Sequence, residues 1–230
     1  MTDIAYVEGI IKILFVCVII GAAYIISTRN LLSLISVYSF QSLTMVAIAL
    51  ALWTVEGTPV LLAIAVITFA TKVLLIPYFI ATVQEKIRIK RDIEFHYLNP
   101  TTTLLLSMGL MLVVYIVLSR IIPPTAGKPS LFFFGAVIGI SLMLMGMMVT
   151  FSRKRALTKV VGFLSMENGV LIFGMFVTEL PFIIEFLIVI DLIILVLLTT
   201  ILTVGIDSTL EEYHNRLHRF HLWEGTEESP

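Results

Sequence analysis

The chain has 230 residues, of which 59% are hydrophobic and only 13% are charged, and its formal net charge at pH 7 is -1. Soluble domains carry roughly 25% charged residues, so this composition excludes an ordinary soluble protein, and the balanced charge argues against nucleic acid as a partner. We therefore interpret the chain as an integral membrane protein whose immediate surroundings are a lipid bilayer.

Seven apolar stretches are each long enough to cross a bilayer. A spanning helix needs about 20 mostly apolar residues, and unbroken apolar runs indicate helices rather than the alternating strands of a barrel. The N-terminal sequence MTDIAYVEG is acidic and lacks a cleavage signature, so we expect the first stretch to be retained. The predicted fold class is an all-α, polytopic transmembrane protein, with spans at residues 4–27, 31–53, 59–82, 101–122, 130–151, 157–178 and 181–204.

Basic residues in the loops predict the orientation of the chain. The loops after the first, third and fifth spans carry most of the Lys and Arg found between spans, and cytoplasmic loops carry such an excess. We expect a multi-pass protein of the cell inner (plasma) membrane, with its N-terminus outside and its C-terminus in the cytoplasm. The loop residues are Arg29, Lys86, Arg88, Lys90, Arg91, Arg153, Lys154 and Arg155, against Arg120 and Lys128 on the opposite side.

Two parts of the chain align as copies of one three-helix unit. Without gaps, RNLLSLISVYSFQSLTMVAIALA from Arg29 aligns with RALTKVVGFLSMENGVLIFGMFV from Arg155, which places Gln41 over Glu167. Parallel repeats are a known design of membrane proteins, and the alternative is chance similarity between apolar helices. We expect a single membrane domain over residues 1–230: units at 1–82 and 130–204, a basic loop and linking helix at 83–129, and a cytoplasmic tail at 205–230.

Three ionisable residues lie near the middle of predicted spans: Lys72, Glu167 and Asp191. A charge at a helix centre costs on the order of 2.5 to 3.5 kcal/mol on the insertion scale, so such a residue is by default a functional hypothesis. We expect all three in one polar layer, as a proton or cation relay. The alternative is a structural ion pair between Lys72 and one acid. A single ion pair would leave one of the two carboxyl groups without a basic partner, which favours the relay.

Four further residues are secondary candidates for the ion path. Glu185 is predicted near the outer end of the last span, where an exit site and a plain boundary residue are both consistent with its position. Lys159 lies two turns before Glu167 and is better explained as a charge that sets topology. Gln41 and Asn168 can orient water but cannot release a proton at neutral pH.

The tail EEYHNRLHRFHLWEGTEESP places three histidines, His214, His218 and His221, at a spacing that resembles metal ligands. No Cys or carboxylate completes a convincing set, so we expect an interfacial amphipathic helix there. The chain also has no phosphate loop, redox CxxC, haem ligand pair or catalytic triad. We therefore expect no metal, no cofactor and no catalytic residues in this chain.

Two stretches resemble a known family. SRKRALTKVVGFLSMENGVLIFG, with its SMENG motif, and ITFATKVLLIPYF resemble component E of hydrogenase-4 and related formate hydrogenlyase complexes. The last three predicted spans are similar to the K subunit of complex I. The resemblance implies that Glu167 matches the buried glutamate of that subunit's second helix, and that Asp191 takes the place of its second buried acid. The first unit would then have Gln41 and Lys72 at these places, and we expect it to supply a counter-charge.

The resemblance implies a function as a noncatalytic membrane-arm subunit of a complex-I-like hydrogenase of the formate hydrogenlyase type. Such a subunit would help to couple electron transfer to proton or sodium translocation, as an accessory part of an oxidoreductase. Its expected partners are antiporter-like membrane subunits and a hydrophilic arm that holds iron-sulfur clusters and a nickel-iron centre. Two alternatives remain: a standalone or antiporter-type secondary transporter, and a structural scaffold subunit without an ion path.

Overall fold

Regular structure in the described part of the chain is entirely helical. The computed structural model describes residues 2–28, 30–87, 99–122, 130–153, 156–177, 188–194, 196 and 200. Its elements are α1 (Thr2–Ser27), α2 (Leu31–Glu56), α3 (Pro59–Thr68), the π-helix η1 (Phe69–Leu75), α4 (Ile76–Ile87), α5 (Pro100–Ile121), α6 (Ser130–Ser152) and α7 (Ala156–Val177). Residues 188–194 are also helical.

Six helices within these ranges are long and apolar enough to cross a membrane. The third combines α3, η1 and the start of α4 into one continuous span, Pro59–Thr82. The prediction of a polytopic helical protein is thus confirmed for six of its seven spans, while most of the seventh, 181–204, lies outside the described residues. The orientation stays a prediction. The other five spans are Ala5–Ser27, Leu32–Glu56, Pro100–Ile121, Leu131–Ser152 and Thr158–Val177.

Local sequence signals explain where the helices begin and end. Asn30 precedes α2, and its Oδ1 accepts a hydrogen bond from the backbone N–H of Leu32 at 3.2 Å, as an N-cap does. Gly57 ends α2 in the left-handed conformation, with φ at 67°, which costs glycine little because it has no Cβ. Pro59 and Pro100 begin α3 and α5, at a position where a missing N–H is harmless.

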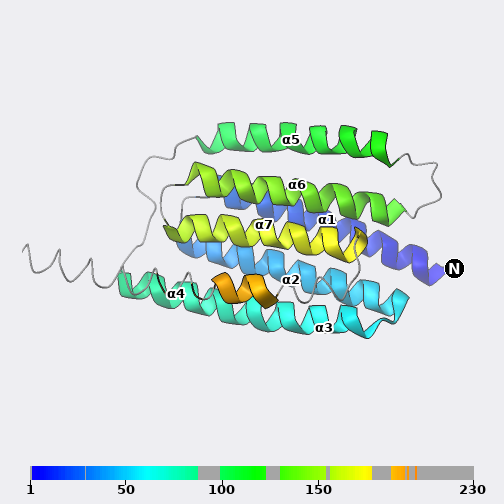
Figure 1. Cartoon of the computed structure of the whole chain (residues 1–230), viewed down its shortest axis with the longest axis horizontal. Coiled ribbons are helices and arrows are strands. Elements are labelled where there is room, and N and C mark those ends of the chain that lie inside the picture. Colours follow the sequence, from blue (N-terminus) through cyan, green and yellow to red (C-terminus); the bar gives the residue numbers. More distant parts are fainter. Residues whose placement is uncertain are drawn as a thin grey trace, which may run out of the picture.

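The helices lie side by side and roughly parallel in one bundle (Figure 1). α5 forms one edge, and the α3–η1–α4 span forms the other. Between these edges, α1 contacts α2 and α6, while α2 contacts α7 and η1. The ends of α1, α4 and α6 lie at the same end of the bundle as the starts of α2, α5 and α7, so the helix ends that flank the three loops predicted to be cytoplasmic share one side.

Glycines let α6 and α7 approach each other closely. A Cβ added to Gly139 of α6 would lie 2.6 Å from the backbone nitrogen of Phe173, and one added to Gly169 of α7 would lie 2.5 Å from that of Met143. Small residues at such an interface let two helix backbones come into contact within a membrane. This contact fixes the rotation of α7, and therefore the direction in which its polar residues point.

A buried arginine joins the ends of α1 and α6. Arg153 is 1% exposed, and its Nη2 donates hydrogen bonds to the carbonyl oxygens of Ile25 at 3.1 Å, Ile26 at 3.1 Å and Thr28 at 2.6 Å. The last carbonyls of a helix lack partners within the helix and carry partial negative charge. The position of Arg153 in a basic loop predicts a charge that sets topology, and in the structure this residue also caps α1.

Candidate functional site

The polar layer begins with Lys72, which lies in the π-helical turn η1. Its side chain is fully buried, at 0% exposure. The π-helix ends with a hydrogen bond from the N–H of Ile76 to the carbonyl oxygen of Thr71. Pro77 follows directly and has no N–H to continue a regular ladder, which favours a local break in the helix. Such π-helical turns are frequent at functional sites, and this one carries Lys72 toward α7.

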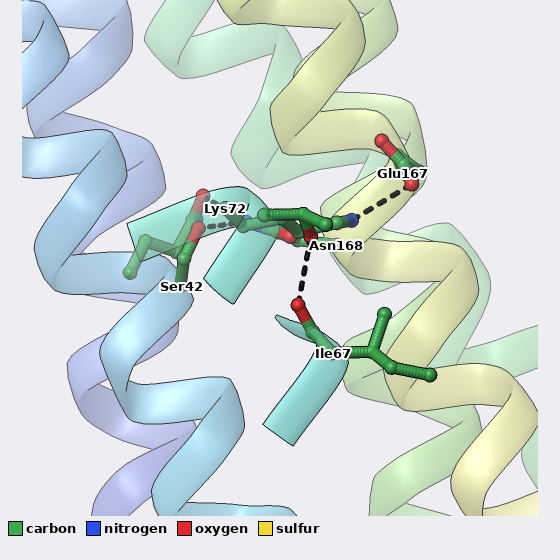
Figure 2. Close-up of polar contacts among 7 residues, drawn as sticks. Ser42, Ile67, Lys72, Glu167 and Asn168 are labelled. Carbon is green, nitrogen blue, oxygen red and sulfur yellow. Dashed lines mark hydrogen bonds and ion pairs between the residues drawn. The ribbon is translucent and has the colours of Figure 1, made fainter. Parts of the chain in front are cut away.

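Lys72 meets two neighbouring residues of α7 (Figure 2). Its Nζ lies 2.9 Å from Oε1 of Glu167 as an ion pair, and it donates a hydrogen bond of 3.3 Å to Oδ1 of Asn168. Glu167 is 2% exposed, so both charges are withdrawn from solvent and lipid alike. Sequence alone left open which acid Lys72 pairs with, and the structure pairs it with Glu167.

An ordered chain of amides extends from Lys72 to α1. Because an ammonium group only donates, Asn168 must present its oxygen to Lys72 and its nitrogen to the other side. Its Nδ2 donates to Oε1 of Gln41 at 3.2 Å, and Ser165 Oγ donates to the same oxygen at 3.2 Å. Nε2 of Gln41 then donates to the carbonyl oxygen of Val18 at 3.3 Å. The charge on Lys72 thus sets the orientation of two buried amides in turn.

Asp191 brings a second carboxyl group to this layer. It is 6% exposed, and neither of its oxygens accepts a hydrogen bond from a described residue. The carboxyl groups of Glu167 and Asp191 are close enough to interact electrostatically. Two carboxylates that share a buried site repel each other, which favours a proton on one of them. Lys72 can neutralise only one of the two charges, so the described residues of the layer include one acid more than bases.

Three polar residues of the layer escaped the sequence-based prediction: Tyr38, Ser42 and Ser165. All three are buried, and Ser42 accepts a hydrogen bond from Asn168 Nδ2 at 3.4 Å. Tyr38 lies three residues before Gln41, and Ser42 lies one residue after it. Because Tyr38 and Ser42 are four residues apart, they share one face of α2. Their position near a glutamine in the middle of a span could have indicated that they belong to the polar layer. Hydroxyl groups are common in spanning helices, however, so their presence alone does not predict a site.

Among the candidates that the structure describes, Lys159 lies away from the layer. Lys159 is half-buried and precedes Glu167 by eight residues, which is about 12 Å along the helix axis. Lys12, near the start of α1, forms an ion pair of 2.9 Å with Glu8, in which the side chains are 45% and 29% exposed. Glu185 and the histidines of the tail lie outside the described residues, so their predicted roles stay predictions.

The arrangement is suited to holding and releasing a proton or a small cation. One ammonium group and two carboxyl groups from three separate segments meet inside the bundle, with amides and hydroxyls that can orient water beside them. Ionisable residues inside membrane spans typically face such an interior and mark ion pathways. Comparisons of the chain with known protein families, curated proteins and solved structures find no match.

Proposed function

We propose that the chain is a noncatalytic membrane subunit that takes part in moving protons or sodium ions across the bilayer. The observation that carries the proposal is the excess of acid over base among the described residues of the layer: Lys72 pairs with Glu167, and Asp191 lies beside Glu167 without a cation of its own. A purely structural ion pair needs one acid and one base. A second buried carboxyl group must be protonated, hydrated or bound to a cation, and a transport site needs a group of this kind.

The parent assembly we propose is a complex-I-like hydrogenase of the formate hydrogenlyase type. The support is the resemblance of the SMENG motif and of ITFATKVLLIPYF to hydrogenase-4 component E, since these two stretches contain Glu167 and Lys72. In such an assembly the iron-sulfur clusters and the nickel-iron centre belong to partner subunits. This chain contributes to coupling by changing the protonation or cation occupancy of its buried site when its neighbours move.

A secondary transporter is the second candidate, and the break at η1 is the observation that favours it. Transporters often bind their substrates at mid-membrane between interrupted helices, which occur in corresponding positions of two repeats. In the described ranges η1 interrupts one span, and α1, α2, α5, α6 and α7 run without a break. The span that corresponds to Pro59–Thr82 in the second unit, 181–204, lies mostly outside the described residues, so the paired break that a transporter requires stays a prediction.

The proposal is tested first by the partners of the chain and then by one substitution. Purification in mild detergent should yield redox subunits together with this chain. In membrane vesicles that contain the parent complex, Glu167→Gln should leave assembly intact and reduce ion translocation at least about tenfold, since a positioned proton-transfer group contributes about 10² to 10⁴ in rate. Glu56→Gln, at the exposed end of α2, is the control and should translocate normally.

Two outcomes would contradict the proposal. Normal translocation by a correctly assembled Glu167→Gln complex would show that the polar layer is structural and would favour a scaffold role. Copurification without any redox subunit, combined with ion transport by the isolated chain in liposomes, would favour the secondary transporter.

A further inference from the structure

Three buried polar side chains of the layer have unused hydrogen-bonding capacity. The hydroxyl of Tyr38 and both carboxyl oxygens of Asp191 have no hydrogen-bond partner among the described residues, and Glu167 is engaged only through its ion pair with Lys72. Native proteins satisfy nearly all buried polar groups, with ordered water where protein atoms are absent. Several orphaned groups in one layer therefore call for a shared partner.

Tyr38 is close to both carboxyl groups. It is fully buried on α2, and its hydroxyl interacts electrostatically with Glu167 and with Asp191. A phenol can donate one hydrogen bond and accept others without carrying charge. It can therefore stabilise an ionised carboxylate while leaving the charge balance of the layer unchanged.

The neighbours of Tyr38 determine where its proton points. Ser42 accepts a hydrogen bond from Asn168, and within the described ranges its own O–H is not committed to another acceptor. The Ser42 hydroxyl lies beside the Tyr38 oxygen, although the contact falls short of hydrogen-bond geometry. A small rotation lets Ser42 donate to Tyr38, whose proton is then directed away from Ser42 and toward the carboxyl groups.

We infer that Tyr38, Glu167 and Asp191 enclose at least one ordered water molecule, and that the Tyr38 hydroxyl is a positioning residue for a proton shared by the two carboxyl groups. The proton leaves the carboxyl O–H of one acid for the bridging water, which gives one of its own protons to the other carboxylate. The total charge stays constant, and Tyr38 donates a hydrogen bond throughout without ionising. This inference deepens the proposed function, because the shared proton becomes the species that the site handles.

Within the part of the chain that the structure describes, three charged groups face this proton. Lys72 faces it from η1, Glu167 from α7 and Asp191 from residues 188–194. α1 contributes the carbonyl oxygen of Val18 at the far end of the amide chain, and α6 has no ionisable side chain between Ser130 and Ser152.

Infrared difference spectroscopy tests the inference directly, because a protonated carboxyl group has a resolved C=O stretch. The full-length chain, in lipid nanodiscs and within the parent complex where one copurifies, is titrated with pH in H₂O and in D₂O. The band is assigned by its loss in Glu167→Gln and Asp191→Asn. We expect Tyr38→Phe to shift the C=O band of the protonated carboxyl group to higher frequency, because the carbonyl oxygen loses a hydrogen-bond donor. The variant should still unfold in a cooperative transition, which shows that it is folded.

Two further variants separate a positioning role from mere packing. Difluorotyrosine incorporated at position 38 keeps the hydroxyl and makes it a stronger donor, so the band should move to lower frequency. Tyr115→Phe, at a half-exposed site on α5, should leave it unchanged. A band that is identical in wild type, Tyr38→Phe and the fluorinated protein would overturn the inference.

The infrared experiment tests the shared proton, and the translocation experiment tests the proposed function, so either proposal can be rejected without the other. A Tyr38-sensitive band combined with normal translocation in Glu167→Gln would keep the shared proton and reject the proposed function. Loss of translocation in Glu167→Gln without any effect of Tyr38 on the band would do the reverse. The absence of any protonated carboxyl band across the titration would remove the shared proton, and with it the inference.

Discussion

Breaking the buried ion pair should lower the free energy of unfolding far more than breaking an exposed ion pair of the same length. Lys72 and Glu167 lie 2.9 Å apart, with side chains 0% and 2% exposed. Removing one partner of such a pair destabilises a protein by about 3 to 5 kcal/mol, because the other charge is left buried without compensation. Lys72→Met or Glu167→Gln alone should therefore destabilise the chain by about 3 kcal/mol.

The double variant, Lys72→Met with Glu167→Gln, should be much less unstable than the sum of the two single variants. With both charges removed no unpaired ion remains from the pair, so we expect a coupling free energy of about 2 to 3 kcal/mol. The assay is SDS-induced unfolding of the purified chain in mixed micelles, followed by circular dichroism, for the wild type, the two single variants and the double variant.

The Lys12–Glu8 pair provides a matched control within the same chain. Its nitrogen and oxygen are also 2.9 Å apart, but the side chains are 45% and 29% exposed. The corresponding cycle with Lys12→Met and Glu8→Gln should give a coupling below about 1 kcal/mol. Additivity within about 0.5 kcal/mol at Lys72 and Glu167 would refute the conclusion that their charges depend on each other.

Three further predictions concern the packing that holds the layer in place. Gly139→Leu should destabilise the chain by about 3 kcal/mol, because the leucine side chain would collide with the backbone of α7. The control is Gly109→Leu, where an added Cβ meets nothing within 4 Å, and it should leave stability unchanged in the same unfolding assay. Arg153→Met should destabilise the chain by on the order of 3 kcal/mol, because three hydrogen bonds to carbonyl oxygens are lost, and it should expose the end of α1 to proteolysis. Equal stability of Arg153→Met and of Arg120→Met, a substitution at an exposed site, would contradict the capping role. Asn168→Leu should cost about 2 to 3 kcal/mol, since it removes one hydrogen-bond acceptor of Lys72 and one donor to Gln41. An unchanged unfolding midpoint would speak against the amide chain.

The spans were predictable because the membrane imposes a simple requirement on composition and length. Each of six predicted apolar runs coincides with an observed helix to within a few residues, and the boundaries follow from local signals at Asn30, Gly57, Pro59 and Pro100. Hydropathy averages over a whole span, so it detects a helix without knowing what surrounds it. The same averaging carries no information about which helices touch.

The contacts of the site could be predicted only in part. The depth of Lys72, Glu167 and Asp191 follows from counting residues along each span, which placed them in one layer. Which acid Lys72 meets depends on the rotation of η1, and a π-helical turn changes that rotation in a way that the periodicity of an α-helix does not encode. Tyr38 was missed because its role depends on the carboxyl groups opposite it, which belong to other segments.

The cap that Arg153 places on α1 has a consequence for the order in which the protein matures. Helices enter the membrane from the ribosome in chain order, so α1 is inserted long before its capping residue has been synthesised. Arg153 is 125 residues further along the chain than Thr28, whose carbonyl oxygen it binds. Until α6 arrives, the end of α1 depends on water at the membrane surface for its hydrogen bonds. The hydrogen bonds at the end of α1 are thus completed only after α6 has been synthesised.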